Sequence, residues 1–225
     1  MLISIFFILK DKKEEHEQEE IFKEIINVAK ENTKEIQEDT INMEELYRIN
    51  NDIVGWIKIK NTNIDYPIMQ TKERPNYYLR RNFYKQYSIL GTPYIAENCN
   101  IETSDNLIIY GHHINGNKLF GELENYKSKD YYNEHKNIKF YTMTENVEYE
   151  IIAVFKTVAY TGFQYYKFCD AEDEREFNTF INKCKELSFY DTEKIAVYGD
   201  KLITLSTCEY SNQNGRLVIV ARKIL

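Results

Sequence analysis

Short apolar segments separated by turn-forming residues predict a mainly β protein built as a closed, or nearly closed, barrel. The chain is rich in residues that favour strands, with 19 Tyr and 12 Phe among 225 residues. Eight segments have strand character, whereas few have helical periodicity. We therefore expect a barrel of about eight strands, with N-terminal helices and one helix inserted before the last two strands.

The chain begins with the apolar run Leu2 to Leu9, which Lys10, Lys12 and Lys13 follow. A membrane-spanning helix needs about 20 apolar residues, so this run is too short to cross a bilayer. Its basic residues also come after it, whereas a signal peptide carries them in front. Two interpretations stay open, a local apolar end or the tail of a membrane anchor whose upstream part is missing; we favour the second.

Helical periodicity is clearest between Glu14 and Glu38, where a narrow apolar stripe predicts an amphipathic helix. Asn42, with Glu45 three residues later, predicts the capped start of a second, short helix. Strand patterns begin soon afterwards. We therefore divide the chain into an N-terminal segment, 1–39, and one globular domain, 40–225.

The strand segments share β-branched or aromatic residues and turn-forming neighbours. They are Val54–Ile59, Ile64–Met69, Thr92–Ala96, Leu107–Gly111, Ile138–Thr142, Val147–Lys156, Lys201–Ser206 and Leu217–Lys223. Pro67 lacks a backbone N–H and indicates an edge position. Between the strands, Lys118–Glu124 predicts one or two helical turns and Glu172–Leu187 an amphipathic helix.

Composition excludes several functions. The net charge of −7 argues against nucleic acid as the main partner, because binding phosphates requires a cationic surface. The four cysteines form no Cys-x-x-Cys pair, and no spaced set of ligands accompanies the adjacent His112 and His113. We therefore expect no metal and no cofactor. A disulfide among Cys99, Cys169 and Cys184 is open if the domain is exported.

Cys208 and Arg216 lie at facing ends of a predicted hairpin, on either side of the turn Ser211–Gly215. A cysteine nucleophile needs a base and a site that stabilises the oxyanion formed on attack. The permanently charged Arg216 can serve the second need. Neither residue type is expected at this position for packing alone.

Histidine can supply the base, and the chain has four. His16 and His135 lie in polar surroundings typical of the surface. His112 and His113 follow the strand Leu107–Gly111, and because a strand alternates its faces, at most one of them can point to a shared site. The residues alone leave a catalytic histidine and a strand-end surface histidine equally open.

The motifs Tyr110-Gly111-His112, Leu205-Ser206-Thr207-Cys208 and Gly215-Arg216-Leu217 resemble the sortases, cysteine transpeptidases of Gram-positive bacteria. The order His, Cys, Arg is theirs. Class B is indicated by the N-terminal helices, the block around Trp56 and Asp65-Tyr66-Pro67, and the helix before the cysteine strand. The resemblance covers residues 40–225. Class B members often have an Asp a few residues after the Gly-Thr pair that begins the strand Thr92–Ala96. This chain departs from that pattern, because Ala96 and Glu97 occupy those positions.

The resemblance implies that Cys208 attacks the Thr carbonyl of an Asn-Pro-x-Thr-like sorting motif in a secreted protein. Arg216 stabilises the oxyanion, a thioester forms, and His112 transfers protons. A peptidoglycan amine would then accept the protein at the outer face of the cell membrane. We expect Ser206, Thr207 and Glu209, together with Tyr77, Leu79 and Asn82, to contact the sorting peptide, although barrel packing explains the last three equally well.

Two other functions stay open. One is a hydrolytic cysteine endopeptidase, a thiol protease, although the sequence surroundings typical of papain-like enzymes and caspases are absent. The other is a non-catalytic surface binding module built on a β-barrel. The product formed with and without an amine acceptor distinguishes the first from a transpeptidase, and the effect of Cys208→Ala distinguishes the second.

Overall fold

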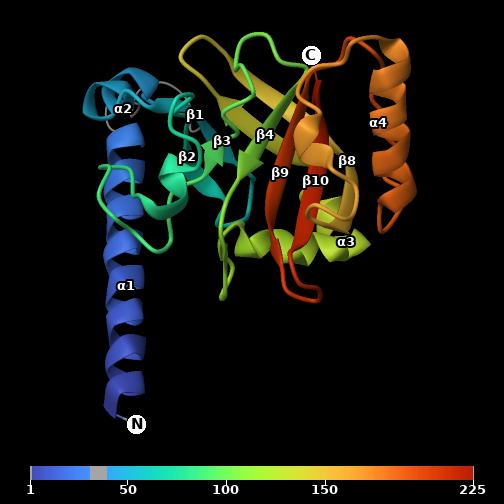
Figure 1. The fold of residues 1–225 in the computed structure, drawn as a ribbon. Coiled ribbons are helices and arrows are strands. Elements are labelled where there is room, and N and C mark those ends of the chain that lie inside the picture. Colours follow the sequence, from blue (N-terminus) through green and yellow to red (C-terminus); the bar gives the residue numbers. More distant parts are fainter. Residues whose placement is uncertain (1, 31–39, 225) are drawn as a thin grey trace.

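The computed structural model describes residues 2–30 and 40–224, and its centre is a closed barrel of eight strands (Figure 1). Around the barrel the strands follow the order β1, β2, β3, β4, β9, β10, β8, β7. Their bounds are β1 Ile53–Lys58, β2 Asp65–Met69, β3 Tyr94–Ile95, β4 Asn106–Tyr110, β7 Asn137–Tyr141, β8 Asn146–Val158, β9 Leu202–Glu209 and β10 Gly215–Ile224. The predicted mainly β barrel is confirmed, and each of the eight predicted segments corresponds to one strand.

Two neighbouring pairs in the barrel, β2 with β3 and β4 with β9, are parallel, and the other pairs are antiparallel. The short strands β5 (His113–Ile114) and β6 (Lys118–Leu119) form a separate ribbon, which the sequence did not predict. Strand β3 pairs with β2 only through Met69 and Tyr94. Pro67 therefore pairs with Trp56 of β1 on one side, and none of the described strands pairs with it on the other, which suits a residue without an N–H.

Helices and single turns cover the outside of the barrel. The α-helices are α1 Leu2–Lys30, α2 Met43–Ile49, α3 Lys129–Glu134 and α4 Glu174–Leu187, and the 3₁₀ helices are η1 Tyr77–Arg80, η2 Phe120–Lys127 and η3 Tyr165–Lys167. In Figure 1, α1 runs along one side of the barrel and α4 along the opposite side. The predicted helices at 118–124 and 172–187 correspond to η2 and α4.

The first helix starts earlier than predicted, at Leu2 instead of Glu14, and is described up to Lys30. The predicted continuation to Glu38 falls on residues 31–39, outside the described residues. Phe22, Ile25 and Ala29 of its predicted stripe are buried against the barrel. Among the described residues, no helix has both the length and the apolar character needed to span a membrane.

Both capped helices begin as their sequences require. The side chain of Asn42 accepts a hydrogen bond from the backbone N–H of Glu45 at the start of α2, as predicted. Asp173 does the same for Glu176 at the start of α4. On α4 the buried face consists of Phe177, Phe180, Ile181 and Cys184, and it packs against β8. The helix therefore covers one side of the barrel.

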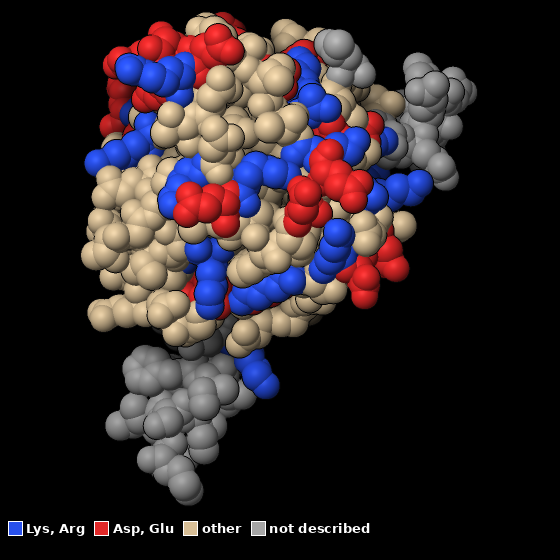
Figure 2. Space-filling view, turned by 90° about the vertical axis from the view of Figure 1, so that its right-hand side faces the viewer, with Lys and Arg blue, Asp and Glu red and all other residues tan. Residues whose placement is uncertain are grey.

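On the face beside α4, Lys and Arg side chains lie among Asp and Glu side chains (Figure 2). The described residues include several ion pairs, such as Lys201 with Asp105 (2.9 Å) and Lys185 with Asp191 (2.9 Å). A nucleic-acid-binding face would instead gather charges of one sign. This face therefore offers no basic stripe of that kind.

Candidate functional site

Strand pairing brings the predicted histidine and cysteine segments together. Strands β4 and β9 are parallel, with Tyr110 opposite Ser206. The pairing continues past the end of β4, because Gly111 N–H donates to Ser206 O (3.1 Å) and Thr207 Oγ1 donates to Gly111 O (2.8 Å). His112 comes two residues after Tyr110, and Cys208 comes two residues after Ser206. The register of the two segments therefore places His112 and Cys208 opposite each other.

Arg216 joins them from the other side of β9. In the antiparallel β9–β10 ladder, Cys208 lies opposite Arg216. Directly opposite residues in a ladder project from the same face of the sheet. The guanidinium donates a hydrogen bond to the neighbouring carbonyl of Gly215 (2.9 Å), and a guanidinium carries five N–H donors in all.

These three side chains line one pocket of about 740 Å³. The pocket lies where β4 and β9 end and where β3 and β10 begin, and the turn η3 forms part of its wall. Its remaining lining residues are Asn76, Leu79, Thr92, Tyr94, Ala96, Glu97, Asn98, Tyr110, Gly111, Ala159, Tyr160, Tyr165, Tyr166, Lys167, Ser206 and Thr207. The predicted His, Cys and Arg thus meet in one place.

The histidine that lines the pocket is His112. Its Nε2 lies 2.8 Å from Leu79 O, and since a carbonyl oxygen only accepts, Nε2 carries the proton. The unprotonated nitrogen of the neutral ring is therefore Nδ1. Burial lowers the pKa of His112, the Leu79 contact opposes this shift, and nearby Arg80 adds to it. The imidazole is accordingly neutral at pH 7.

His113 lies outside the pocket, as strand alternation requires of one member of the pair. Its Nδ1 is 3.1 Å from the backbone carbonyl of Cys208, and its ring packs edge-on against Tyr210. Glu124 lies 3.9 Å from the same nitrogen. His113 therefore contacts the backbone of Cys208 from outside the pocket.

Of the six predicted peptide contacts, Leu79, Ser206 and Thr207 line the pocket. The other three do not. Glu209 is buried beside Lys127 (2.8 Å) and Ser211, Tyr77 lies beneath the guanidinium groups of Arg74 and Arg81, and Asn82 is buried in a turn with Gln86. The side chains of these three residues are engaged in holding loops together.

Several pocket residues were missed from the sequence, although a signal for some was present. Thr92, Tyr94 and Ala96 alternate along one predicted strand, and Tyr110 with His112 and Ser206 with Cys208 share that spacing. Tyr94, Tyr110 and Ser206 form one row across β3, β4 and β9. The residues of η3 carried no such signal.

Tyr165, on η3, is the most tightly held of the missed residues. Its hydroxyl lies 2.5 Å from Ser206 Oγ. Burial raises the pKa of Tyr165 to about 12, against the opposing effects of Ser206 and of the Arg216 charge. The hydroxyl therefore stays protonated and can fix the wall of the pocket next to the cysteine strand.

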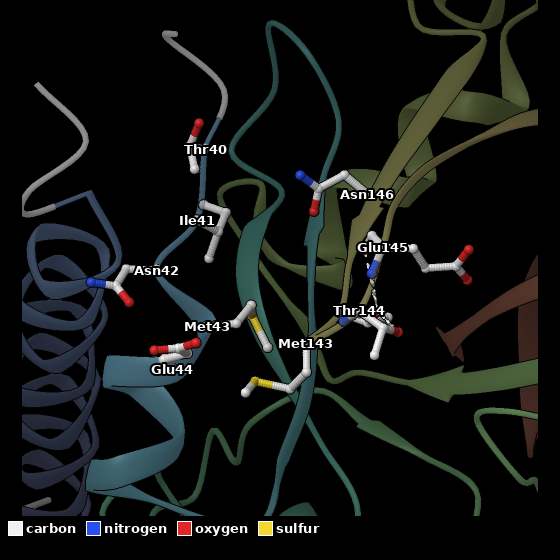
Figure 3. A pocket seen from close by; sticks show the side chains of 10 residues that line it. Thr40, Ile41, Asn42, Met43, Glu44, Met143, Thr144, Glu145 and Asn146 are labelled. Carbon is white, nitrogen blue, oxygen red and sulfur yellow. Dashed lines mark hydrogen bonds between the residues drawn. The ribbon is translucent and has the colours of Figure 1, made fainter. Parts of the chain in front are cut away.

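A second hollow, of about 440 Å³, lies between the start of α2 and the β7–β8 turn (Figure 3). Thr40 to Glu44 and Thr142 to Asn146 line it, with the side chains of Met43 and Met143 near each other. None of these ten residues is a nucleophilic Cys or a His. Among the described residues no cluster of His, Cys, Asp and Glu could hold a metal ion either.

Comparisons with known proteins agree with the strand pairing. A family model described as Sortase domain matches residues 57–224. Sortase B of Staphylococcus aureus (strain NCTC 8325 / PS 47) is 32% identical over 184 residues, which cover 80% of this chain and 74% of that protein. Sortase B of Listeria monocytogenes serovar 1/2a is 35% identical over 186 residues, 81% of this chain and 74% of that protein.

Solved structures give the same result for the fold. A Staphylococcus aureus sortase B–substrate complex superimposes with a TM-score of 0.85 at 28% identity, covering 94% of this chain and 98% of that one. The similarity thus extends over the barrel and the helices around it.

Proposed function

Because this chain belongs to the sortase family, and within it to class B, we propose that it acts as a cysteine transpeptidase and that the reaction takes place in the pocket that Cys208 lines. Members of this family anchor proteins to the cell wall. The observation that carries the proposal is that Cys208, His112 and Arg216 line one pocket, on three adjoining chain segments.

The first half of the reaction forms a thioester. Cys208 gives its proton to Nδ1 of His112, and its sulfur attacks the Thr carbonyl carbon of a sorting motif of the Asn-Pro-x-Thr kind. The carbonyl oxygen becomes an oxyanion, which the unused N–H groups of Arg216 stabilise. The C–N bond then breaks, and the leaving amine takes the proton back from His112.

The second half transfers the protein to an amine. An amino group of the peptidoglycan attacks the thioester carbon, and His112 Nδ1 accepts the proton that this amine loses. The C–S bond breaks, Cys208 is restored, and a new amide joins the protein to the wall. A neutral His112 is the form that can accept a proton in this step.

The hydrogen bond between His112 and Leu79 supports this use of Nδ1. It fixes the ring orientation and the tautomer, leaving one nitrogen for proton transfer. Leu79, Ser206 and Thr207 lie beside the three reacting residues and are placed to contact the sorting peptide. Both partners, the secreted protein and the wall amine, would meet the chain outside the cell, and attachment through the N-terminal segment would hold it at the membrane.

The experiment is a peptide assay with two arms. The purified chain is incubated with a peptide containing an Asn-Pro-x-Thr motif, with and without a short amine acceptor such as triglycine. A transpeptidase forms the amide product with the acceptor and forms slow hydrolysis product without it. A product distribution indifferent to the amine would favour a hydrolytic endopeptidase.

Cys208→Ala provides the control for catalysis itself. The variant should bind peptide and form no product, and intact protein mass should show the thioester only in the parent chain. If the parent chain neither cleaves peptide nor forms an adduct, the binding-module interpretation replaces the transpeptidase.

A further inference from the structure

Two cysteines that the proposed reaction does not use lie next to each other. Cys99 follows β3, Cys169 follows η3, and 70 positions separate them in the chain. Their sulfur atoms are 3.2 Å apart, and both side chains are buried, with exposed fractions of 1% and 5%. A buried pair of sulfur atoms at this distance is within reach of bond formation.

The start of β4 holds both cysteines in place. The backbone N–H of Asn106 donates to Cys169 O (2.8 Å), and its side-chain amide donates to Phe168 O (2.8 Å). The sulfur of Cys99 contacts Asn106 O (3.4 Å) and the N–H of Ile108 (3.5 Å). One short segment of strand therefore fixes the two loops relative to each other.

We propose that Cys99 and Cys169 are a disulfide-forming pair whose bond joins two walls of the pocket. Glu97 and Asn98, just before Cys99, line one wall, and Tyr166 and Lys167, just before Cys169, line another. A bond between the two loops would hold these walls at a constant separation. The proposal concerns cross-linking alone and does not rest on the transpeptidase reaction.

The other cysteines do not compete for this bond. Cys184 is fully buried in the face of α4 that packs on the barrel, and Cys208 lies on β9 in the pocket. Within the described residues, only Cys99 and Cys169 have a sulfur–sulfur contact. The cross-link therefore has one expected connectivity.

The chemistry is thiol–disulfide exchange with a small-molecule or protein disulfide as oxidant. A hydrogen bond from the Cys169 thiol lowers the pKa of Cys99. The same contact, together with burial, raises the pKa of Cys169. Cys99 thiolate attacks one sulfur of the oxidant and releases the other as a thiolate. Cys169, on losing its proton, then attacks the mixed disulfide, so two electrons pass to the oxidant and leave it as two thiols.

Burial decides when the exchange occurs. In the folded chain both sulfur atoms are covered, so an oxidant reaches them before the loops close over β4. Once formed, the bond is protected from reductants by the same cover. We therefore expect the pair to be oxidised during folding in an oxidising environment and to stay oxidised afterwards.

The test uses the full chain carrying Cys208→Ala, so that the pocket thiol cannot react. The protein is refolded in a mixture of oxidised and reduced glutathione, denatured, and its free thiols are counted. We expect one free thiol, on Cys184, from the three that remain, and a mass lower by two hydrogen atoms. Peptide mapping should join the segments that contain Cys99 and Cys169.

Two further variants in the same background serve as matched controls. Adding Cys184→Ser should leave the cross-link in place, and adding Cys99→Ser should remove it. Refolding in reductant instead of the glutathione mixture should lower the Tm by about 5–10 °C, because the bond closes a long loop. The Cys99→Ser variant should show no such response.

Three free thiols in folded protein after refolding under oxidising conditions would overturn the proposal. So would a cross-link to Cys184. Both readouts come from the Cys208→Ala chain alone, so they hold even if a Cys99 variant fails to fold. Loss of peptide cleavage by the parent chain, by contrast, would count against the transpeptidase proposal only.

Discussion

Arg216 stands directly opposite Cys208 in the β9–β10 ladder, so its guanidinium and the thiol leave the sheet on the same face. The turn Tyr210–Asn214 joins the two strands, and the backbone geometry alone keeps the two groups together. A developing oxyanion on a substrate bound to Cys208 would therefore meet N–H groups already in position. Such preorganised donors usually supply the largest single contribution to catalysis.

Arg216→Ala should lower kcat by about 10²–10³-fold in the peptide assay while leaving the Tm nearly unchanged. Arg216→Lys should lose less, because it keeps the charge and loses the planar set of donors. Arg222→Lys, on the same strand but paired with Glu150, is the matched control and should keep full activity. Equal activity of the Arg216→Ala and parent chains would exclude an oxyanion role.

His112→Ala should lower kcat by about 10²–10⁴-fold, because it removes the group that we propose transfers protons. His113→Ala should reduce activity only mildly, since it loses a contact with the backbone carbonyl of Cys208 and no pocket side chain. Steady-state kinetics of both variants, with circular dichroism as a check on folding, measure the difference. The reverse result, with His113 essential and His112 dispensable, would reassign the base.

Arg80→Gln should raise the pKa of His112, because the Arg80 charge opposes protonation of the ring. Arg80 is exposed, so the shift should shrink as salt is added. The measurement is the acidic limb of the pH dependence of kcat/KM, which should move upward in the variant. A limb that moves downward would show that another group titrates there.

Gly91→Ala should destabilise the chain and weaken catalysis together. Gly91 has φ +60°, and a Cβ there would lie 2.6 Å from the carbonyl oxygens of both Tyr78 and Leu79. Tyr78 is buried and bonded to Asn50 and Asp52, so this segment cannot easily move away. Because Leu79 O orients His112, the shift should reach the ring in the pocket.

We expect Gly91→Ala to lower the Tm by about 5–10 °C and to reduce kcat. Gly199→Ala is the matched control, since Gly199 also has positive φ (+98°) but a Cβ added there would meet nothing within 4 Å. It should show a smaller loss of Tm and unchanged kcat. Unchanged kcat in both variants would show that the position of the Leu79 carbonyl does not affect catalysis.

Protonation of Glu209 should make the folded chain less stable at acidic pH. Burial by itself would raise its pKa, but hydrogen bonds from Lys127 and Ser211 lower it to about 2. A pKa lower in the folded than in the unfolded chain adds stability above the unfolded value, about 4.3. That stability, on the order of 3 kcal/mol, is lost as the pH falls from about 4 to 2.

Denaturant unfolding between pH 2 and 7 measures this loss of stability. In the Glu209→Gln chain the free energy of unfolding should depend less on pH over this range. Glu186→Gln is the control, because Glu186 is an exposed partner of Lys183 on α4 and should change the profile little. An acid profile that is identical for the parent and Glu209→Gln chains would rule out the assigned pKa shift.

The strands and their approximate ends could be predicted from the sequence because period-two patterns and turn residues mark them locally. The barrel order could not, because β4 and β9 become neighbours only through long-range pairing. The three residues proposed as catalytic were identified by their motifs. Glu209, Tyr77 and Asn82 were expected in the groove because they are near motif residues. They lie outside the pocket of Cys208, beside Lys127, Arg74 and Gln86, and their contact with the peptide stays a prediction.

Residues of η3 were missed for a related reason. A single 3₁₀ turn has no periodicity of its own, and Tyr165 reaches the pocket only because its hydroxyl meets Ser206 on β9. The start of α1 was misplaced because the apolar run at residues 2–9 lacks the amphipathic pattern by which the helix was recognised. Helical geometry continues through it without a break.

The parallel pairing of β4 with β9 has a consequence for how activity arises. Tyr110 and Ser206 are 96 positions apart, yet their pairing sets the level at which His112 lies beside Cys208. Parallel pairings between such distant segments form late and slowly, since the entropy of closing the loop must be overcome first. Cys208, and the His112 proposed as its base, are therefore brought together only when the last two strands are in place, so the proposed activity would arise late in folding.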